Sequence, residues 1–382
     1  MKVIVSCSGK FHAFNLVEEL QRNGIEVLFF TSYSSKKNRF LKYFTKRRDK
    51  ELIDNKNIET NIFVAFALKI FSRNPQLVNN YFDIWVSRKI QKLDADWFIG
   101  WSSMSENSIK VAKSKGIKTI LERGSTHIMF QNNILKQEYK IRGRSFEIDK
   151  KTIYKEIIEY SIVDLIVVPS SFSKSTFLDN GIKFSKIFVN QFGASKYFFN
   201  DKDSSDFNFR VLYLGSFSIR KGAYYLYEAI NEIKHLNIEF WFIGKVDQEV
   251  KFIYDELNTK KNVTFFGHIN HYKLNSLINQ CSVALQPSIE EGQSMVINQV
   301  MQCGIPYIAT PNSGAEELII DNFNGIIIPA MSSSSISSAI VDLYNKPSLL
   351  RHLSSNILKT TIKENTWDSY GNRYIKILKN ES

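Results

Sequence analysis

Side chains that could do chemistry gather in the segment from Pro287 to Pro311, which reads PSIEEGQSMVINQVMQCGIPYIATP. Apolar residues recur there at helical spacing (Val296, Val300 and Met301), so we expect a loop and a short amphipathic helix between two buried strands. The first turn of a helix has unpaired backbone N–H groups and the positive end of the helix dipole, and both favour a bound phosphate. The carboxylate of Glu291 can accept hydrogen bonds from sugar hydroxyls. This combination indicates a site for a nucleotide sugar.

A second cluster of chemical groups lies in LYLGSFSIRKG, residues 212–222. The pattern predicts a strand, a tight glycine turn, and then Arg220 and Lys221 before a helix begins. Arginine can bind phosphate oxygens through two parallel hydrogen bonds, and lysine acts as a point charge. The alternative is a pair of exposed basic residues in a turn. Because the acidic segment follows in the same half of the chain, we favour an anion site.

Short apolar runs that alternate with helical patterns must position these groups. Such alternation predicts parallel sheets with helices on both faces. The polar run NDKDSSDFN at residues 200–208 divides the chain into two halves of similar size, so we interpret it as an interdomain linker. Because ligands bind at the carboxyl ends of parallel strands, we expect a cleft between the halves. A long loop with a helix is expected at residues 131–145.

The length of 382 residues and the 43% share of hydrophobic residues favour two domains with substantial cores. Cys7, Cys281 and Cys303 are widely spaced beside apolar segments, as expected for reduced, buried thiols in a cytoplasmic protein. The N-terminus MKVIVSCSGKFH is interpreted as a first strand and not as a signal peptide. The longest apolar run, Ile62 to Leu68, is far shorter than the ~20 residues that span a bilayer, so we expect a soluble or peripheral protein.

The net charge of +12 is concentrated in one segment. Eight basic residues and one acid lie between Lys36 and Lys50, and aromatic side chains interleave with them. One interpretation is a solvated helix face. Another is a patch that docks on anionic lipid at the cytoplasmic face of the inner membrane. Nucleic acid is disfavoured because no recognisable RNA- or DNA-binding motif accompanies the patch.

Several motifs, taken in order, resemble those of family 4 glycosyltransferases, which are α/β enzymes of the GT-B fold and belong to glycosyl transferase group 1. The resemblance covers nearly the whole chain and implies two doubly wound Rossmann-like domains that face each other across a cleft. It implies an acceptor-binding domain at 1–200, a linker at 201–208, a nucleotide-sugar-binding domain at 209–362 and a helix at 363–382 that crosses back to the first domain. The motifs are GKFHAF near the start, ERGSTHIMFQ (122–131), PSSFSKSTFLDNGI (169–182), LGSFSIRKG, GHI (267–269), the 287–311 segment and TWDSYGNRY (366–374).

The resemblance also implies roles for particular residues. Arg220 and Lys221 match the residues that bind the donor pyrophosphate. Glu291 matches the acid that contacts the donor sugar, Gln299 stands where a second acid holds the ribose hydroxyls, and His127 matches a histidine that faces the donor sugar. The expected catalytic residues are His127, Glu291, Arg220 and Lys221; the expected donor-binding residues are Gly9, Ser216, Arg220, Lys221, Gly244, His268, Ile269, Glu291, Gly292, Gln293, Ser294, Met295, Val296 and Gln299; and the expected acceptor-side residues are His12 and Arg123.

The chain departs from the family pattern in three motifs, at four positions. Ser216 stands where many members have an arginine, so Arg220 must carry the positive charge. Gln299 replaces the second acid; it can still donate and accept hydrogen bonds towards a diol, but it has no charge. Gln293 and Ser294 replace the usual Phe-Gly pair, which puts the identity of the donor sugar in question.

The run Asp94-Ala95-Asp96 has the Asp-x-Asp pattern of metal-dependent transferases. It precedes a predicted strand, however, and this is the wrong end of a parallel sheet for ligand binding. We therefore interpret it as a turn and expect no metal. The sequence contains no Walker loop, zinc-ligand spacing or G-x-G-x-x-G, so we expect no cofactor either.

The resemblance implies a retaining, metal-independent glycosyltransferase that moves a hexose from a UDP- or GDP-linked donor to a glycan or lipid-linked acceptor. Such an enzyme would serve the synthesis of cell-surface polysaccharide or glycoconjugate. Two alternatives stay open. One is a sugar-nucleotide epimerase of the same fold, which would turn over without an acceptor. The other is a non-catalytic nucleotide-sugar-binding subunit, which Ser216 and Gln299 make conceivable.

Overall fold

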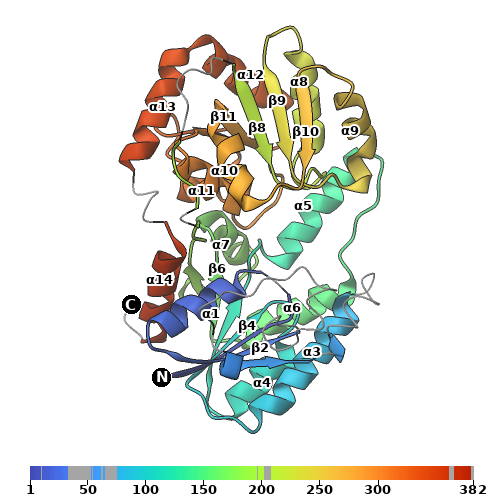
Figure 1. The fold of residues 1–382 in the computed structure, drawn as a ribbon. Helices are drawn as coiled ribbons and strands as arrows, with labels where there is room; N and C mark the ends of the chain where they lie inside the picture. The colour runs from blue at the N-terminus through green and yellow to red at the C-terminus, as the bar shows by residue number, and fades with distance from the viewer. Residues whose placement is uncertain are drawn as a thin grey trace.

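The computed structural model describes residues 1–9, 11–32, 53, 55–61, 63–64, 75–195, 197–201, 208–360 and 365–379. Over these residues the chain forms two parallel sheets, one in each half, with helices between successive strands (Figure 1). The α/β fold class is therefore confirmed. The basic segment between Lys36 and Lys50 lies outside the described residues, and so do residues 202–207 of the expected linker.

The first sheet belongs to the N-terminal half. Its central strands are buried over their whole length, which explains why their sequences are continuous apolar runs and not alternating patterns. All seven strands pair in parallel, in the order β3 (Ile58–Thr60), β2 (Glu26–Thr31), β1 (Lys2–Cys7), β4 (Trp97–Trp101), β5 (Lys118–Glu122), β6 (Leu165–Val168) and β7 (Ile187–Val189).

One helix of the N-terminal half is only partly predicted by the sequence pattern. Where a long loop with a helix was expected, residues 131–145 are mostly one regular helix, α5. The named helices are α1 (Ala13–Arg22), α3 (Pro75–Ile90), α4 (Glu106–Ser114), α5 (Ile128–Ile141), α6 (Lys150–Ile162) and α7 (Ser171–Leu178).

The second sheet belongs to the C-terminal half and repeats the doubly wound plan. Its strands run in the order β10 (Val263–Gly267), β9 (Glu239–Ile243), β8 (Arg210–Leu214), β11 (Val283–Gln286), β12 (Tyr307–Ala309) and β13 (Ile326–Ile327). The helices are α8 (Ala223–Glu232), α9 (Lys251–Leu257), α10 (His271–Asn279), α11 (Met295–Gln302), α12 (Ser333–Asn345), α13 (Pro347–Lys359) and α14 (Trp367–Leu378).

Two helices cross between the halves. The last helix, α14, packs against α1 of the N-terminal half, and Trp97 donates its indole N–H to the backbone oxygen of Leu378 at 3.1 Å (Figure 1). In the opposite direction, α5 reaches the C-terminal half, where Glu138 accepts a hydrogen bond from Tyr225 at 2.7 Å. Contacts of α5 and α14 therefore hold the two halves together.

Three further expectations concern the cysteines, the Asp94-Ala95-Asp96 run and helices that could span a membrane. The three cysteines are buried and form no disulfide. Asp96 accepts from the backbone N–H of Lys2 at 2.7 Å, and Asp94 pairs with Lys115, so both acids lie at the amino ends of strands. Within the described ranges, no helix has both the length and the apolar character needed to cross a bilayer.

Candidate active site

A cavity of about 700 Å³ lies between the two halves, where the carboxyl ends of both sheets meet. From the C-terminal half it is lined by Arg220, Lys221, Glu291 and residues 293–296. From the N-terminal half it is lined by aromatic, hydroxyl and basic side chains that follow β1, β4 and β5. The position agrees with the rule that ligands bind outside the carboxyl ends of parallel strands.

A close backbone approach brings the two motifs of the C-terminal half together. Gly222 has a φ of +79°, and a Cβ atom there would lie 2.1 Å from the backbone oxygen of Pro287. Only glycine suits such a position. Close to this contact, the N–H of Ile289, two residues after Pro287, donates to the backbone oxygen of Arg220, two residues before Gly222, at 3.0 Å. The Arg-Lys loop and the acidic loop are thus neighbours in space.

The two cations of the Arg-Lys loop are each paired with a carboxylate. Nε of Arg220 lies 2.7 Å from Oε2 of Glu290, and Lys221 pairs with Glu291. Glu291 also accepts from the hydroxyl of Ser288 at 3.1 Å. These pairs hold the basic groups at the cavity edge, where an anionic ligand would meet them.

Glu290 is a residue that sequence reasoning missed. Its carboxylate is fully buried and accepts hydrogen bonds from Ser125, Thr126 and Gln131 of the other half as well as from Arg220. Burial by itself would raise the pKa of this carboxyl, but Arg220 and the hydroxyl and amide donors hold the pKa below its usual value. Glu290 therefore joins the acidic loop to the N-terminal half as a charged group.

The loop after Glu291 presents backbone to the cavity. Gln293, Ser294, Met295 and Val296 line it, and α11 begins at Met295. The first N–H groups of this helix have no partner within the helix, so the first turn can accept an anion. Gly292 itself lies against the other half, because a Cβ atom there would be 2.5 Å from the backbone oxygen of Gly124.

The N-terminal wall of the cavity contains His12 and Arg123, whose acceptor-side role stays a prediction. Arg123 is buried and pairs with Glu156 at 3.1 Å, and it donates to Gln131 at 2.9 Å. Two further groups, one from each half, are unsatisfied. Nε1 of Trp101 and Nε2 of Gln293 are buried donors that line the cavity and have no hydrogen-bond partner in the described part of the chain.

The structure corrects the expectation for His127. Its ring is buried against Tyr160 and Phe177, with ring centroids 5.1 and 5.0 Å away, and it does not line the cavity. His127 is the N-cap of α5, and its Nδ1 accepts from the N–H of Met129 at 3.3 Å. The helix start turns this side chain inward, so Arg123 and Ser125 face the cavity instead.

Other residues of the expected donor set lie outside the cavity wall. Ser216 lines an adjacent hollow of about 560 Å³, together with Arg220, Lys221 and Tyr139. Gly244 packs on Gly215, because a Cβ atom on Gly244 would lie 2.0 Å from the backbone oxygen of Gly215. The remaining ones (Gly9, His268, Ile269, Gly292 and Gln299) do not line the cavity.

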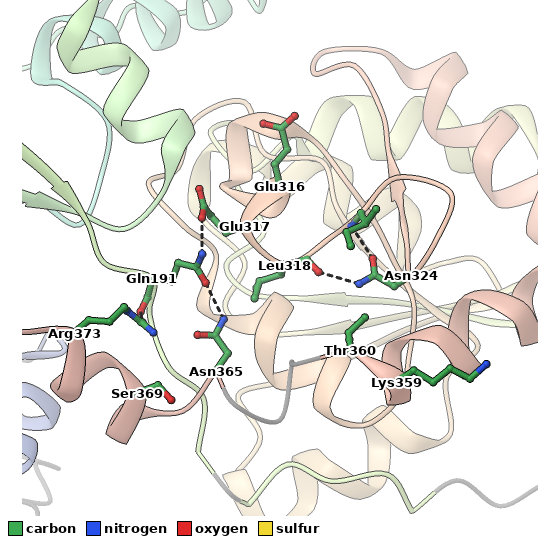
Figure 2. A pocket seen from close by; sticks show the side chains of 11 residues that line it. Gln191, Glu316, Glu317, Leu318, Asn324, Lys359, Thr360, Asn365, Ser369 and Arg373 are labelled. Atoms are coloured by element: carbon green, nitrogen blue, oxygen red, sulfur yellow. Dashed lines mark hydrogen bonds between the residues drawn. The ribbon is translucent and has the colours of Figure 1, made fainter. Parts of the chain in front are cut away.

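A further hollow of about 560 Å³ lies where α14 meets the 315–317 turn (Figure 2). Its polar groups bind one another. Gln191 donates to Glu317 at 2.6 Å and accepts from Asn365 at 3.1 Å, and Glu317 also accepts from the backbone N–H of Ser171 at 2.5 Å. These bonds connect the two halves, so we interpret this hollow as part of their contact.

Over the residues that the structure describes, no three His, Cys, Asp or Glu side chains are grouped as around a metal ion. Metal independence of the reaction stays a prediction.

Two facing Rossmann-like domains with a cavity at their strand ends define the GT-B fold. The model of the family "Glycosyl transferases group 1" matches residues 198–360, within the C-terminal half of this chain. The resemblance to this group is thus confirmed, whereas the narrower family 4 stays a prediction.

Individual relatives agree with this family. The uncharacterized glycosyltransferase MJ1178 of Methanocaldococcus jannaschii is 28% identical over 193 residues, which are 50% of this chain and 53% of the relative. The chain spans about half the length of the curated relatives that it matches.

Solved structures match over the whole chain and show the fold. The sucrose-phosphate synthase of Thermosynechococcus elongatus has a TM-score of 0.74 at 17% identity, covering 100% of this chain and 98% of that one. Anabaena HepE, in complex with UDP-glucose, has a TM-score of 0.70 at 14% identity, covering 100% of both chains.

Proposed function

We propose that the protein is a retaining glycosyltransferase that transfers a hexose from a UDP- or GDP-linked donor to a glycan or lipid-linked acceptor. One observation carries the proposal: Arg220, Lys221 and the first turn of α11 border a single cavity between the domains. Negative charge develops on the leaving diphosphate, and preorganised cations and amides stabilise it. The solved HepE structure with UDP-glucose shows that this fold accommodates such a donor.

The remaining cavity groups suit a ligand rich in hydroxyls. Glu291 can accept hydrogen bonds, whereas the unsatisfied donors of Trp101 and Gln293 can give them. A buried donor without a partner costs about 1–3 kcal/mol, so a ligand that pairs with it gains affinity. We infer that the sugar of the donor or of the acceptor satisfies these groups.

We further propose that the reaction needs no divalent metal, because the two cations supply the positive charge. We place the enzyme in the synthesis of cell-surface polysaccharide or glycoconjugate, at the cytoplasmic face of the membrane through the basic segment Lys36–Lys50. Co-sedimentation with anionic vesicles tests this attachment. Unchanged binding after neutralisation of the segment would contradict it.

A ligand panel tests the central function. We expect one nucleoside diphosphate, or its sugar, to raise the unfolding temperature, because a ligand at ~100 times its Kd adds ~2.7 kcal/mol of stability. Release of that diphosphate from its sugar, lost in Glu291→Ala, would establish catalysis. A chain that binds the nucleotide sugar but never releases the diphosphate would instead be a binding subunit.

A further inference from the structure

His12 and Glu122 form a buried hydrogen-bonded pair in the N-terminal wall of the cavity. His12 follows β1 at the start of α1, and Glu122 is the last residue of β5, so the sheet brings them together from 110 positions apart. Nε2 of His12 lies 3.0 Å from Oε2 of Glu122, and the two side chains are only 4% and 2% exposed. His12 lines the same cavity as Arg220 and Lys221.

The carboxylate of Glu122 is held from its other side by α14. Its Oε1 accepts from the hydroxyl of Tyr370 at 2.9 Å and from the hydroxyl of Tyr374. Burial, and then the charge of Glu122, raise the pKa of both hydroxyls well above the ordinary value, so both stay protonated and donate. Of the three donors to Glu122, His12 is the one that lines the cavity.

Aromatic rings fix the orientation of the His12 ring. Phe192, Trp101 and Tyr370 lie around it, with centroids 4.6, 5.3 and 5.7 Å away. Because Glu122 holds Nε2, the second ring nitrogen, Nδ1, has no hydrogen-bond partner within the described ranges. A buried carboxylate that fixes one imidazole nitrogen leaves the other as a proton acceptor and stabilises the imidazolium that forms.

We propose that His12 is a catalytic residue whose Nδ1 accepts the proton of the acceptor hydroxyl, and that Glu122 is the residue that positions it. This inference rests on the proposed glycosyl transfer. The acceptor oxygen forms its bond to the anomeric carbon on the same face from which the diphosphate leaves, as retention requires, while the bond from that carbon to the diphosphate oxygen breaks and its electron pair leaves with the diphosphate. The acceptor proton passes to His12, which later returns it to solvent.

The opposing interpretation is that the pair only anchors α14. Loss of an anchor lowers stability and all activities together, whereas loss of a base lowers the reaction rate and leaves nucleotide binding intact. A small base diffusing into the vacated space can replace a missing imidazole but cannot replace an anchor. The experiment therefore measures the reaction rate, nucleotide binding and rescue by imidazole separately.

The experiment compares wild type and His12→Gly in the full chain. Release of nucleoside diphosphate is measured with UDP-glucose, UDP-galactose, UDP-N-acetylglucosamine and GDP-mannose, with water as the acceptor, and calorimetry measures binding of UDP and GDP. We expect the variant to lose about 10²-fold in rate, as is typical for a missing general base. We expect its nucleotide affinity to stay within twofold, and free imidazole to restore part of the rate. His235→Ala, at an exposed histidine, is the matched control and should keep the wild-type rate.

Glu122→Gln provides a second test with a residue of the same shape. We expect a rate loss of at least tenfold that imidazole does not restore, because the base itself is still present. Wild-type-like rates in His12→Gly, or a loss in the folded variant that imidazole never restores, would overturn the role of His12. A wild-type chain that neither binds these nucleotides nor releases them would overturn the proposed function instead.

Discussion

The two cations of the Arg-Lys loop already have carboxylate partners before any ligand arrives. Lys221 pairs with Glu291 and Arg220 with Glu290, so each long side chain is held in place at the cavity. Because these side chains are already ordered, binding of a diphosphate costs less side-chain conformational entropy. The carboxylates also provide an alternative partner for the cations when the product leaves.

Lys221 should contribute mainly to the rate. Removal of one preorganised donor to a developing negative charge costs about 10²–10³-fold in kcat, and we expect this loss for Lys221→Ala. Steady-state kinetics of diphosphate release measures it. Lys251→Ala, at an exposed lysine paired with Asp255, is the control. A wild-type kcat in Lys221→Ala would remove this residue from the site.

His127 should make the free energy of unfolding depend on pH. Burial and the nearby charge of Arg123 lower its pKa to about 4 from an ordinary value of 6.5. Between these values the unfolded chain binds a proton that the folded chain does not, so stability falls as the pH drops from 6.5 towards 4.

His127→Asn should weaken this dependence, since asparagine can still cap α5 but does not titrate. Urea unfolding at about pH 7 and about pH 5 measures the difference for both proteins. An equally large loss of stability in the variant would contradict the assignment.

At the scale of elements, the site depends on two loops that touch across the domain boundary. Gly292 is in contact with Gly124 and Ser125, and its backbone oxygen accepts from the hydroxyl of Ser170 at 2.5 Å. No side chain fits at this position without separating the loops. The expected donor loop is therefore also a contact between domains.

Gly292→Ala should push the two loops apart. A displacement of about 1 Å between reacting groups can cost about 10²-fold in rate, and we expect a loss of that order with normal secondary structure. Diphosphate release and far-UV circular dichroism measure the two effects. Full activity in this variant would show that the loops need not touch during the reaction.

The strands, the Arg-Lys loop and the acidic loop could be predicted because their signals are local: apolar runs, glycine turns and a helix start. The buried position of Glu290 could not, because adjacent residues in a loop point in different directions that only the tertiary contacts decide. The same holds for His127, which the start of α5 turns into the core. The pairing of His12 with Glu122 needed the strand order of the sheet.

At the scale of the whole molecule, Glu290 links the two domains because its buried carboxylate accepts hydrogen bonds from Ser125, Thr126 and Gln131 of the N-terminal half. A hydrogen bond to a charged group typically contributes about 1.5–3 kcal/mol. Glu290→Ala should therefore lower the unfolding temperature and increase the radius of gyration in small-angle scattering, since the domains lose this contact. A variant with an unchanged scattering profile would show that α5 and α14 alone keep the domains together.

The most direct test of the account is a crystal structure of the chain with UDP. We predict that the diphosphate lies in the cavity between the domains, with its oxygens within hydrogen-bond distance of Lys221 and of the first backbone N–H groups of α11. A diphosphate bound on another surface, with Arg220 and Lys221 still occupied only by Glu290 and Glu291, would contradict it.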